Sequence, residues 1–298
     1  MVKGLSQKPF IISAVLLVLA GLSALTLFRG QAGTGNITAP AYHPSQFPEY
    51  APLVLDDLAR QKSVPISLAD VMGGVASHHV PTTMPKLAEF YSGLKATKDI
   101  KTFVIIGPDH LDKSQGEINV SRASFLTPFG KLEPDLALIG KIAGTGFTVT
   151  DEKAFDGEHS IAAQTLFISR VFPDAKIVPI IIKSSLGLGR AEELGKMLAG
   201  MTDDSTFVLA SVDFSHYLSA DQARPVDELS SRVLARLDIS SASLIDADSV
   251  QTLTIVMSYL KAKGADKYSG LGVFNTKDFS SEAKYTTGYV FGYWGKSK

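Results

Sequence analysis

Histidine and carboxylate side chains gather at points where the predicted secondary structure changes. Five of the six histidines lie just after a predicted strand or open a predicted helix. The group comprises His78, His79, His110, His159 and His216, with Asp109, Glu158 and Asp213 beside them. Neutral imidazole is a common ligand for zinc, iron, copper and nickel, and two histidines with one carboxylate leave open positions on Fe(II). These residue types predict a divalent metal site, with the remaining histidines available for proton transfer.

Three apolar runs, typical of buried strands, precede most of these histidines. Residues 71–77 lead to His78 and His79, residues 102–106 to His110, and residues 205–212 to His216, whereas His159 opens a helix expected over residues 160–172. Ligands of open α/β sheets collect beyond the carboxyl ends of the strands. We therefore expect these side chains to share one crevice, which either His78 or His79 faces.

Other chemistries have less support. Cysteine is absent, which excludes thiolate nucleophiles, disulfides and Cys-ligated zinc. Ser77 and Ser215 precede histidines, but neither lies in a G-x-S-x-G elbow, and no G-x-G-x-x-G or Walker motif predicts a nucleotide cofactor. The 29 Lys and Arg residues nearly balance the 30 Asp and Glu residues and form no basic cluster, so we expect no nucleic-acid partner.

Strands and helices alternate through most of the chain. Helices are expected over residues 84–94, 135–143, 160–172, 191–201, 225–237 and 249–263, and further strands over residues 176–183, 271–275 and 285–293. Such alternation is typical of a parallel sheet with helices on both faces. It predicts one three-layer α/β/α domain over residues 56–298, with a largely parallel or mixed central sheet.

The N-terminal segment has the composition of a membrane-targeting sequence. Lys3 and Lys8 precede an uncharged apolar stretch, residues 10–28, and a helix of about 20 such residues spans a bilayer. Residues 1–30 therefore predict one N-terminal transmembrane helix that acts as an anchor, with a cleaved signal peptide as the alternative. The position of the lysines puts the globular domain outside the cytoplasm, anchored to the membrane or secreted after cleavage.

Residues 31–55 are rich in glycine and proline. This composition predicts a linker, in which His43 is expected to be solvated.

Five short motifs, in this order and spacing, resemble the Memo family, which includes the prokaryotic AmmeMemoRadiSam system protein B. They are GGVASH at residues 73–78, IIGPDH at 105–110, TPFG at 127–130, EHS at 158–160 and SVDFSHY at 211–217. The resemblance covers about residues 70–293. It implies a fold similar to that of class III extradiol dioxygenases, which are non-haem iron enzymes, and a functional link to a radical-SAM protein.

The resemblance also implies roles for individual residues. His78 and His110 match the family's metal-ligand candidates, and Ser77 stands where the family usually has proline. The family's usual third ligand candidate is a cysteine, and here Asp248-Ser249 stand in its place. Asp248 is then either an oxygen ligand or part of a helix N-cap, and the two roles are compatible.

These features predict a metal-dependent oxidoreductase, with iron as the expected metal and copper or zinc as alternatives. His78 and His110 would bind the metal together with Asp248 or, alternatively, Glu158. His159, His216, Glu158 and Asp213 would form the catalytic set, with His79 and Asp109 as additional pocket residues. Two alternatives stay open: a non-catalytic module that binds a peptide or small molecule in the same pocket, and a metal-assisted hydrolase.

Overall fold

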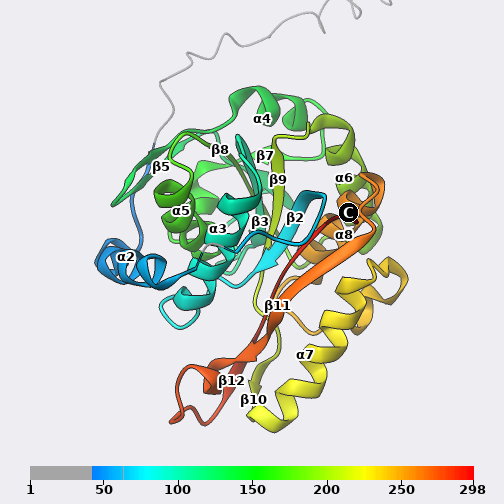
Figure 1. Ribbon diagram of the computed structural model, residues 1–298. Coiled ribbons are helices and arrows are strands. Elements are labelled where there is room, and N and C mark those ends of the chain that lie inside the picture. Colours follow the sequence, from blue (N-terminus) through cyan, green and yellow to red (C-terminus); the bar gives the residue numbers. More distant parts are fainter. Residues whose placement is uncertain (1–41, 63) are drawn as a thin grey trace, which may run out of the picture. The chain divides into compact units, whose positions relative to one another are not determined.

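A mixed β-sheet forms the centre of the domain. The computed structural model describes residues 42–62 and 64–298, and within them the strands of the main sheet follow one another in space as shown in Figure 1. Their order is β10 (His216–Leu218), β12 (Thr286–Lys296), β2 (Asp70–Ala76), β9 (Thr206–Ser211), β3 (Thr102–Pro108), β8 (Lys176–Ile182), β4 (Ile118–Val120) and β7 (Val149–Thr150), with β11 (Lys267–Asn275) paired to β12. The central strands β2, β9, β3 and β8 run parallel, whereas β12 and β4 flank them antiparallel.

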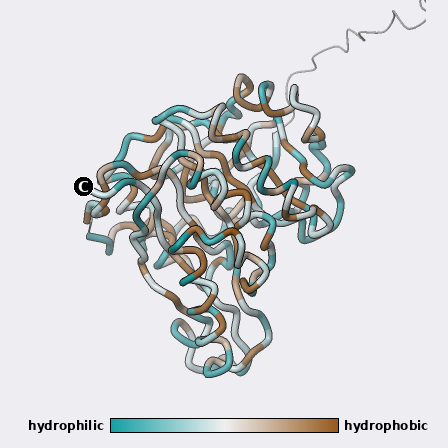
Figure 2. Tube along the Cα trace, turned by 90° about the vertical axis from the view of Figure 1, so that its right-hand side faces the viewer, coloured by the Kyte–Doolittle hydropathy of each residue, from teal (hydrophilic) through white to brown (hydrophobic). Residues whose placement is uncertain are grey.

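Helices cover both faces of this sheet, so the prediction of a three-layer domain with a mixed sheet is confirmed. One face packs against α2 (Ala51–Arg60), α3 (Met84–Thr97) and α5 (His159–Val171), and the other against α4 (Leu136–Ala143), α6 (Leu188–Met201), α7 (Ala220–Ala235) and α8 (Val250–Ala262). Phe103 and Ile105 of β3 enter the first core and Val104 and Ile106 the second, because successive strand residues point to opposite faces. Apolar segments accordingly lie mostly inside the molecule (Figure 2).

Short elements complete the domain. A second sheet joins β1 (Tyr42–His43), β5 (Ser124–Thr127) and β6 (Gly130–Leu132), and 3-10 helices occupy Pro48–Tyr50, Glu152–Phe155, Ile239–Leu244 and Thr276–Asp278. β1 lies in the segment whose composition predicts a linker. His43 is buried there against Phe125 and contacts Glu152 and Ser121, so the prediction of a solvated His43 is wrong.

Helix α7 begins earlier than the sequence predicted. Pro225 suggested a start at residue 225, since proline is tolerated in the first helical turn. The helix instead begins at Ala220, because Ser219 and Gln222 form a capping box that satisfies the first backbone N–H groups. Pro225 lies inside the helix.

The transmembrane helix is the part of the predicted fold that must be corrected. None of the helices in residues 42–62 and 64–298 combines the length and the apolar character needed to cross a bilayer. The longest of those helices, α7, has 16 residues, which at about 1.5 Å per residue is shorter than a hydrocarbon core of about 30 Å. The predicted segment, residues 10–28, lies outside the described residues. The predictions of a membrane partner and of a membrane-anchored location are corrected on the same ground.

Gly107 allows β3 and α5 to approach each other closely. A Cβ atom at this position would lie 2.5 Å from the Ser160 Oγ and 2.7 Å from the Ser160 Cβ. We expect Gly107→Ala to lower the free energy of unfolding by about 1–3 kcal/mol, since the start of α5 must move. Urea unfolding measures this change. Gly189→Ala is the matched control, because open space surrounds Gly189, and equal losses in both variants would contradict the prediction.

Candidate metal centre

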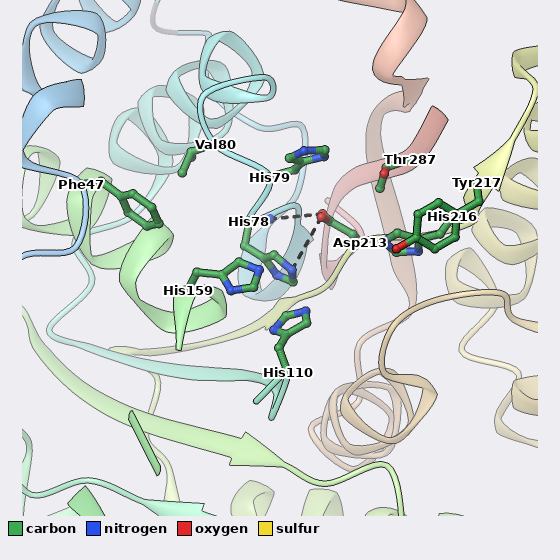
Figure 3. Close-up of a pocket in the computed structure, with 10 residues that line it drawn as sticks. All are labelled: Phe47, His78, His79, Val80, His110, His159, Asp213, His216, Tyr217 and Thr287. Carbon is green, nitrogen blue, oxygen red and sulfur yellow. Dashed lines mark hydrogen bonds and ion pairs between the residues drawn. The ribbon is translucent and has the colours of Figure 1, made fainter. Parts of the chain in front are cut away.

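A cavity of about 460 Å³ opens at the carboxyl ends of β2, β3 and β9 (Figure 3). The five histidines singled out in the sequence line it together with other side chains. The lining comprises Phe47, His78, His79, Val80, His110, His159, Asp213, His216, Tyr217 and Thr287. The expected convergence of the histidines is therefore present in the structure.

Asp248 contacts two of the histidines that line the cavity, His78 and His110. The Nε2 atom of His78 lies 3.2 Å from the Asp248 Oδ2, and the Nε2 atom of His110 lies 3.5 Å from the same oxygen. The Asp213 Oδ2 lies 3.6 Å from the His78 Nε2. His78, Asp213 and Asp248 offer ligand atoms within 4.8 Å of one another, as do His78, His110 and His159. These groups could hold a metal ion.

Glu158 fixes the orientation of His110. Its carboxylate accepts hydrogen bonds from the His110 backbone N–H and from the Ser160 N–H, both at 2.8 Å, and its Oε1 lies 2.8 Å from the His110 Nδ1. The side chain thus caps α5 and at the same time holds the imidazole. A histidine whose Nδ1 donates to a carboxylate presents Nε2 to a metal, and the carboxylate raises its basicity.

A buried polar layer beneath the cavity orients His78. The Gln164 amide donates to the Ser77 carbonyl at 2.8 Å and to the Ser211 hydroxyl at 2.9 Å. The Ser211 hydroxyl in turn lies 3.4 Å from the His78 Nδ1, so the Nε2 atom is directed toward the carboxylates. Ser77, which replaces the family's usual proline, donates to Asp213 at 2.5 Å.

Asp248 is free of the capping role that the sequence left open. Ser249 caps α8, since its Oγ accepts the Thr252 N–H at 3.1 Å. The Asp248 Oδ2 accepts the Asp213 N–H at 3.0 Å, and its Oδ1 is buried without a hydrogen-bond partner in the described part of the chain. A buried carboxylate oxygen without a partner is costly, and a cation would satisfy it.

Charges at this centre are strongly coupled. Burial alone would lower the pKa of His110, but Asp248 and Glu158 outweigh it and raise that pKa to about 10. Burial would raise the pKa of Glu158, yet contact with His110 lowers it to about 2. The pKa of Asp248 is likewise lowered by both histidines in spite of burial. The buried acids therefore keep their negative charge and require positive charge beside them, which protons or a metal ion can supply.

His159 differs from its neighbours. Its ring stacks on that of His110, with 4.2 Å between ring centroids. Burial and the adjacent positive charges of His78 and His110 lower the pKa of His159 to about 4, so this imidazole is neutral at pH 7.

The remaining predicted residues take separate positions. Both His78 and His79 line the cavity, but they contact different residues. The His79 Nδ1 lies 2.6 Å from the Tyr289 hydroxyl. His216 lines the cavity next to Tyr217. Asp109 is not brought into it, because its carboxylate accepts the backbone N–H groups of Lys113 and Ser114 in the following turn.

Asp227 supports the candidate site, and the sequence did not reveal it. It is buried on α7, and its carboxylate accepts the Ser215 backbone N–H at 3.0 Å and the Ser215 hydroxyl at 3.1 Å. A Cβ at Gly288 would lie 2.1 Å from the Asp227 Oδ2, so only glycine allows this approach. The contact fixes the segment between Asp213 and His216. An aspartate within an amphipathic helix gives no sequence signal of such a role.

The fold and the site define an α/β protein with a histidine–carboxylate centre at the edge of its sheet. Residues 57–290 match the family model described as Memo-like protein. The chain therefore belongs to the Memo family, which confirms the resemblance seen in the motifs.

Two MEMO1 family proteins agree with this assignment. A MEMO1 family protein of Pyrobaculum aerophilum is 30% identical over 232 residues, which cover 74% of this chain and 82% of that protein. A MEMO1 family protein of Methanosarcina mazei is 27% identical over 268 residues, which cover 83% and 96%. The crystal structure of an uncharacterized protein from Escherichia coli K12 has a TM-score of 0.48 at 14% identity, and covers 73% of this chain and 99% of that one.

Replacing Glu158 should weaken metal binding, because Glu158 holds the His110 ring. We expect Glu158→Gln to lower the affinity for Zn(II) by about 10- to 100-fold, since the amide no longer holds the His110 ring through a charged contact. Competition with a coloured chelator measures the affinity. Glu152→Gln is the matched control, because Glu152 contacts His43 away from the cavity. An unchanged affinity in Glu158→Gln would contradict the role assigned to this contact.

Asp227 should make stability depend on pH. Burial raises the pKa of Asp227 to about 6 from an ordinary 3.8, although the Ser215 hydrogen bonds lower it. A raised pKa means that the contribution to stability is complete below pH 3.8 and is lost as pH rises through about 6. Relative to Asp227→Asn, the native protein should therefore be more stable at pH 5 than at pH 7.5. Urea unfolding at both pH values tests this, and a pH-independent difference between the two proteins would refute it.

Proposed function

We propose that this Memo-family protein is a metal-dependent oxidoreductase of the non-haem iron type, which acts on a chelating small molecule such as a catechol. One observation carries the proposal. Two imidazole Nε2 atoms, from His78 and His110, lie 3.2 and 3.5 Å from one carboxylate oxygen of Asp248 at an open cavity. Two histidines and one carboxylate are the ligand set of non-haem Fe(II) oxygenases.

The donor atoms fit such an ion. The Asp248 carboxylate faces both imidazoles through its Oδ2, and its Oδ1 is buried without a partner within the described residues, so a cation bound by this carboxylate would offset the cost of its burial. Nitrogen and carboxylate oxygen suit iron, whereas copper(I) prefers the sulfur ligand that this chain lacks. When bound, iron(II) supplies open coordination positions at which O2 and a chelating substrate can meet.

The protein side chains have complementary roles in the proposal. Glu158 holds the His110 ring, and Asp213 accepts hydrogen bonds from Ser77 and from the His78 backbone. His159 lines the cavity beside His110 and can accept a proton from a substrate hydroxyl there. His216 reaches the same cavity from the other side and can return a proton to the product.

Metal content and oxygen consumption test the proposal together. We expect the purified protein, reconstituted anaerobically with Fe(II), to retain about one equivalent of iron, and the His78→Ala/His110→Ala double variant to retain almost none. Asp248→Asn should lose more affinity than Glu158→Gln, since it removes a ligand and not a supporting contact. Asp109→Asn is the matched control, because its carboxylate lies outside the cavity.

The outcome of the oxygen measurement separates the alternatives. Catechol-dependent O2 uptake that needs iron and both histidines supports the oxidoreductase. Ester or amide hydrolysis with zinc and no O2 uptake would instead indicate a metal-assisted hydrolase. A protein that stays metal-free after exposure to Fe(II), Zn(II) and Cu(II) would refute both metal-dependent functions and favour a binding module.

A further inference from the structure

Tyr217 occupies an unusual backbone conformation at the mouth of the cavity. Its φ angle is 62°, in the left-handed region that non-glycine residues rarely adopt. The residue sits at a β-bulge, since His216 pairs with Thr287 and Leu218 pairs with Thr286, so Tyr217 has no partner of its own. Bulges next to active sites redirect a side chain, and strain of this kind persists where a function requires it.

The side chain of Tyr217 is not used for packing. It is 84% exposed, the highest value among the large apolar or aromatic side chains that the structure describes as exposed. Its ring centroid lies 5.9 Å from that of His216, and no hydrogen bond within the described residues holds its hydroxyl. A strained backbone that exposes a large aromatic ring gains nothing in folding stability. The ring is therefore free to contact a ligand that enters the cavity.

The position of the ring indicates which part of a ligand it would meet. Figure 3 shows His78, His110 and His159 between Phe47 on one side and Tyr217 on the other. Both aromatic side chains line the cavity, and Tyr217 lies beside His216, on the opposite side of the histidines from Phe47. A small ring bound at His78 and His110 would leave Tyr217 uncovered, whereas a longer molecule would reach it.

We propose that Tyr217 determines substrate specificity by stacking on an apolar or aromatic substituent that extends from the metal-binding end of the substrate past His216. The inference rests on the proposed function and narrows the substrate class to catechol-like molecules with an aryl or similarly bulky substituent. Aromatic pairs prefer stacked or edge-to-face contacts, and Tyr217 can supply either.

Two pairs of probes test this proposal by calorimetry in the absence of O2. Catechol and 3,4-dihydroxybiphenyl are compared on the Fe(II)-loaded protein, and phenol and 4-hydroxybiphenyl on the metal-free protein. The native protein should prefer each biphenyl by about tenfold or more. Tyr217→Ala and Tyr217→Gly should abolish that preference, whereas Tyr217→Phe should retain it. Tyr285→Ala is the matched control, because Tyr285 is also exposed, at 60%, but does not line the cavity.

Thermal unfolding of Tyr217→Gly excludes a merely structural role. Glycine tolerates positive φ without strain, so this variant should melt at or above the temperature of the native protein while it loses the preference for biphenyls. A preference that survives in Tyr217→Ala would overturn the proposal, and so would a Tyr217→Gly variant that loses stability and binding together. If the proposed metal function fails, catechols should bind the Fe(II)-loaded protein no more tightly than the matching phenols bind the metal-free protein. The dependence of 4-hydroxybiphenyl binding on Tyr217 would remain measurable.

Discussion

The buried carboxylate of Glu158 is the contact on which the geometry of the centre depends. It accepts two backbone N–H groups, from His110 and Ser160, and contacts the His110 ring. One side chain thereby joins the turn after β3 to the first turn of α5. Because a charged carboxylate with this many partners cannot be moved at low cost, the distance between sheet edge and helix is fixed, and His110 with it. The small residue at Gly107 is what allows that distance to be so short.

A second constraint is the balance of charge among the buried carboxylates and the histidines beside them. Asp213, Asp248 and Glu158 are all nearly buried around His78 and His110. Isolated buried carboxylates are strongly unfavourable, so they and the histidines stabilise one another's charged forms. The same arrangement that makes the two histidines accept protons readily also favours a divalent ion. One such ion would supply the positive charge that two protons supply in its absence. Affinity for protons and affinity for metal therefore have one origin here.

The sequence predicted the convergence of the histidines because strand ends meet at one edge, whatever the order of the strands. It could not predict the direction of each side chain. Asp109 turns away because its carboxylate accepts two N–H groups of its own turn. Tyr217 is redirected because it is itself the unpaired residue of the bulge in β10. The prediction of a solvated His43 was wrong because it rested on the glycine and proline content of the segment, which gives no sign of the strand that pairs with β5. The start of α7 depended on a capping box, which outweighed Pro225.

The insertion of β12 between β2 and β11 has a consequence for how the protein is made. β2 comes early in the chain and carries His78 at its end, whereas Thr287 and Gly288, which complete the cavity and support Asp227, come more than 200 residues later. During synthesis on a ribosome, β2 therefore cannot pair with its antiparallel neighbour β12 until β12 has left the ribosome. The nascent chain carries His78 and His110 from an early stage, but Asp248 follows well over 100 residues later, and the cavity wall is completed only after Thr287 is available.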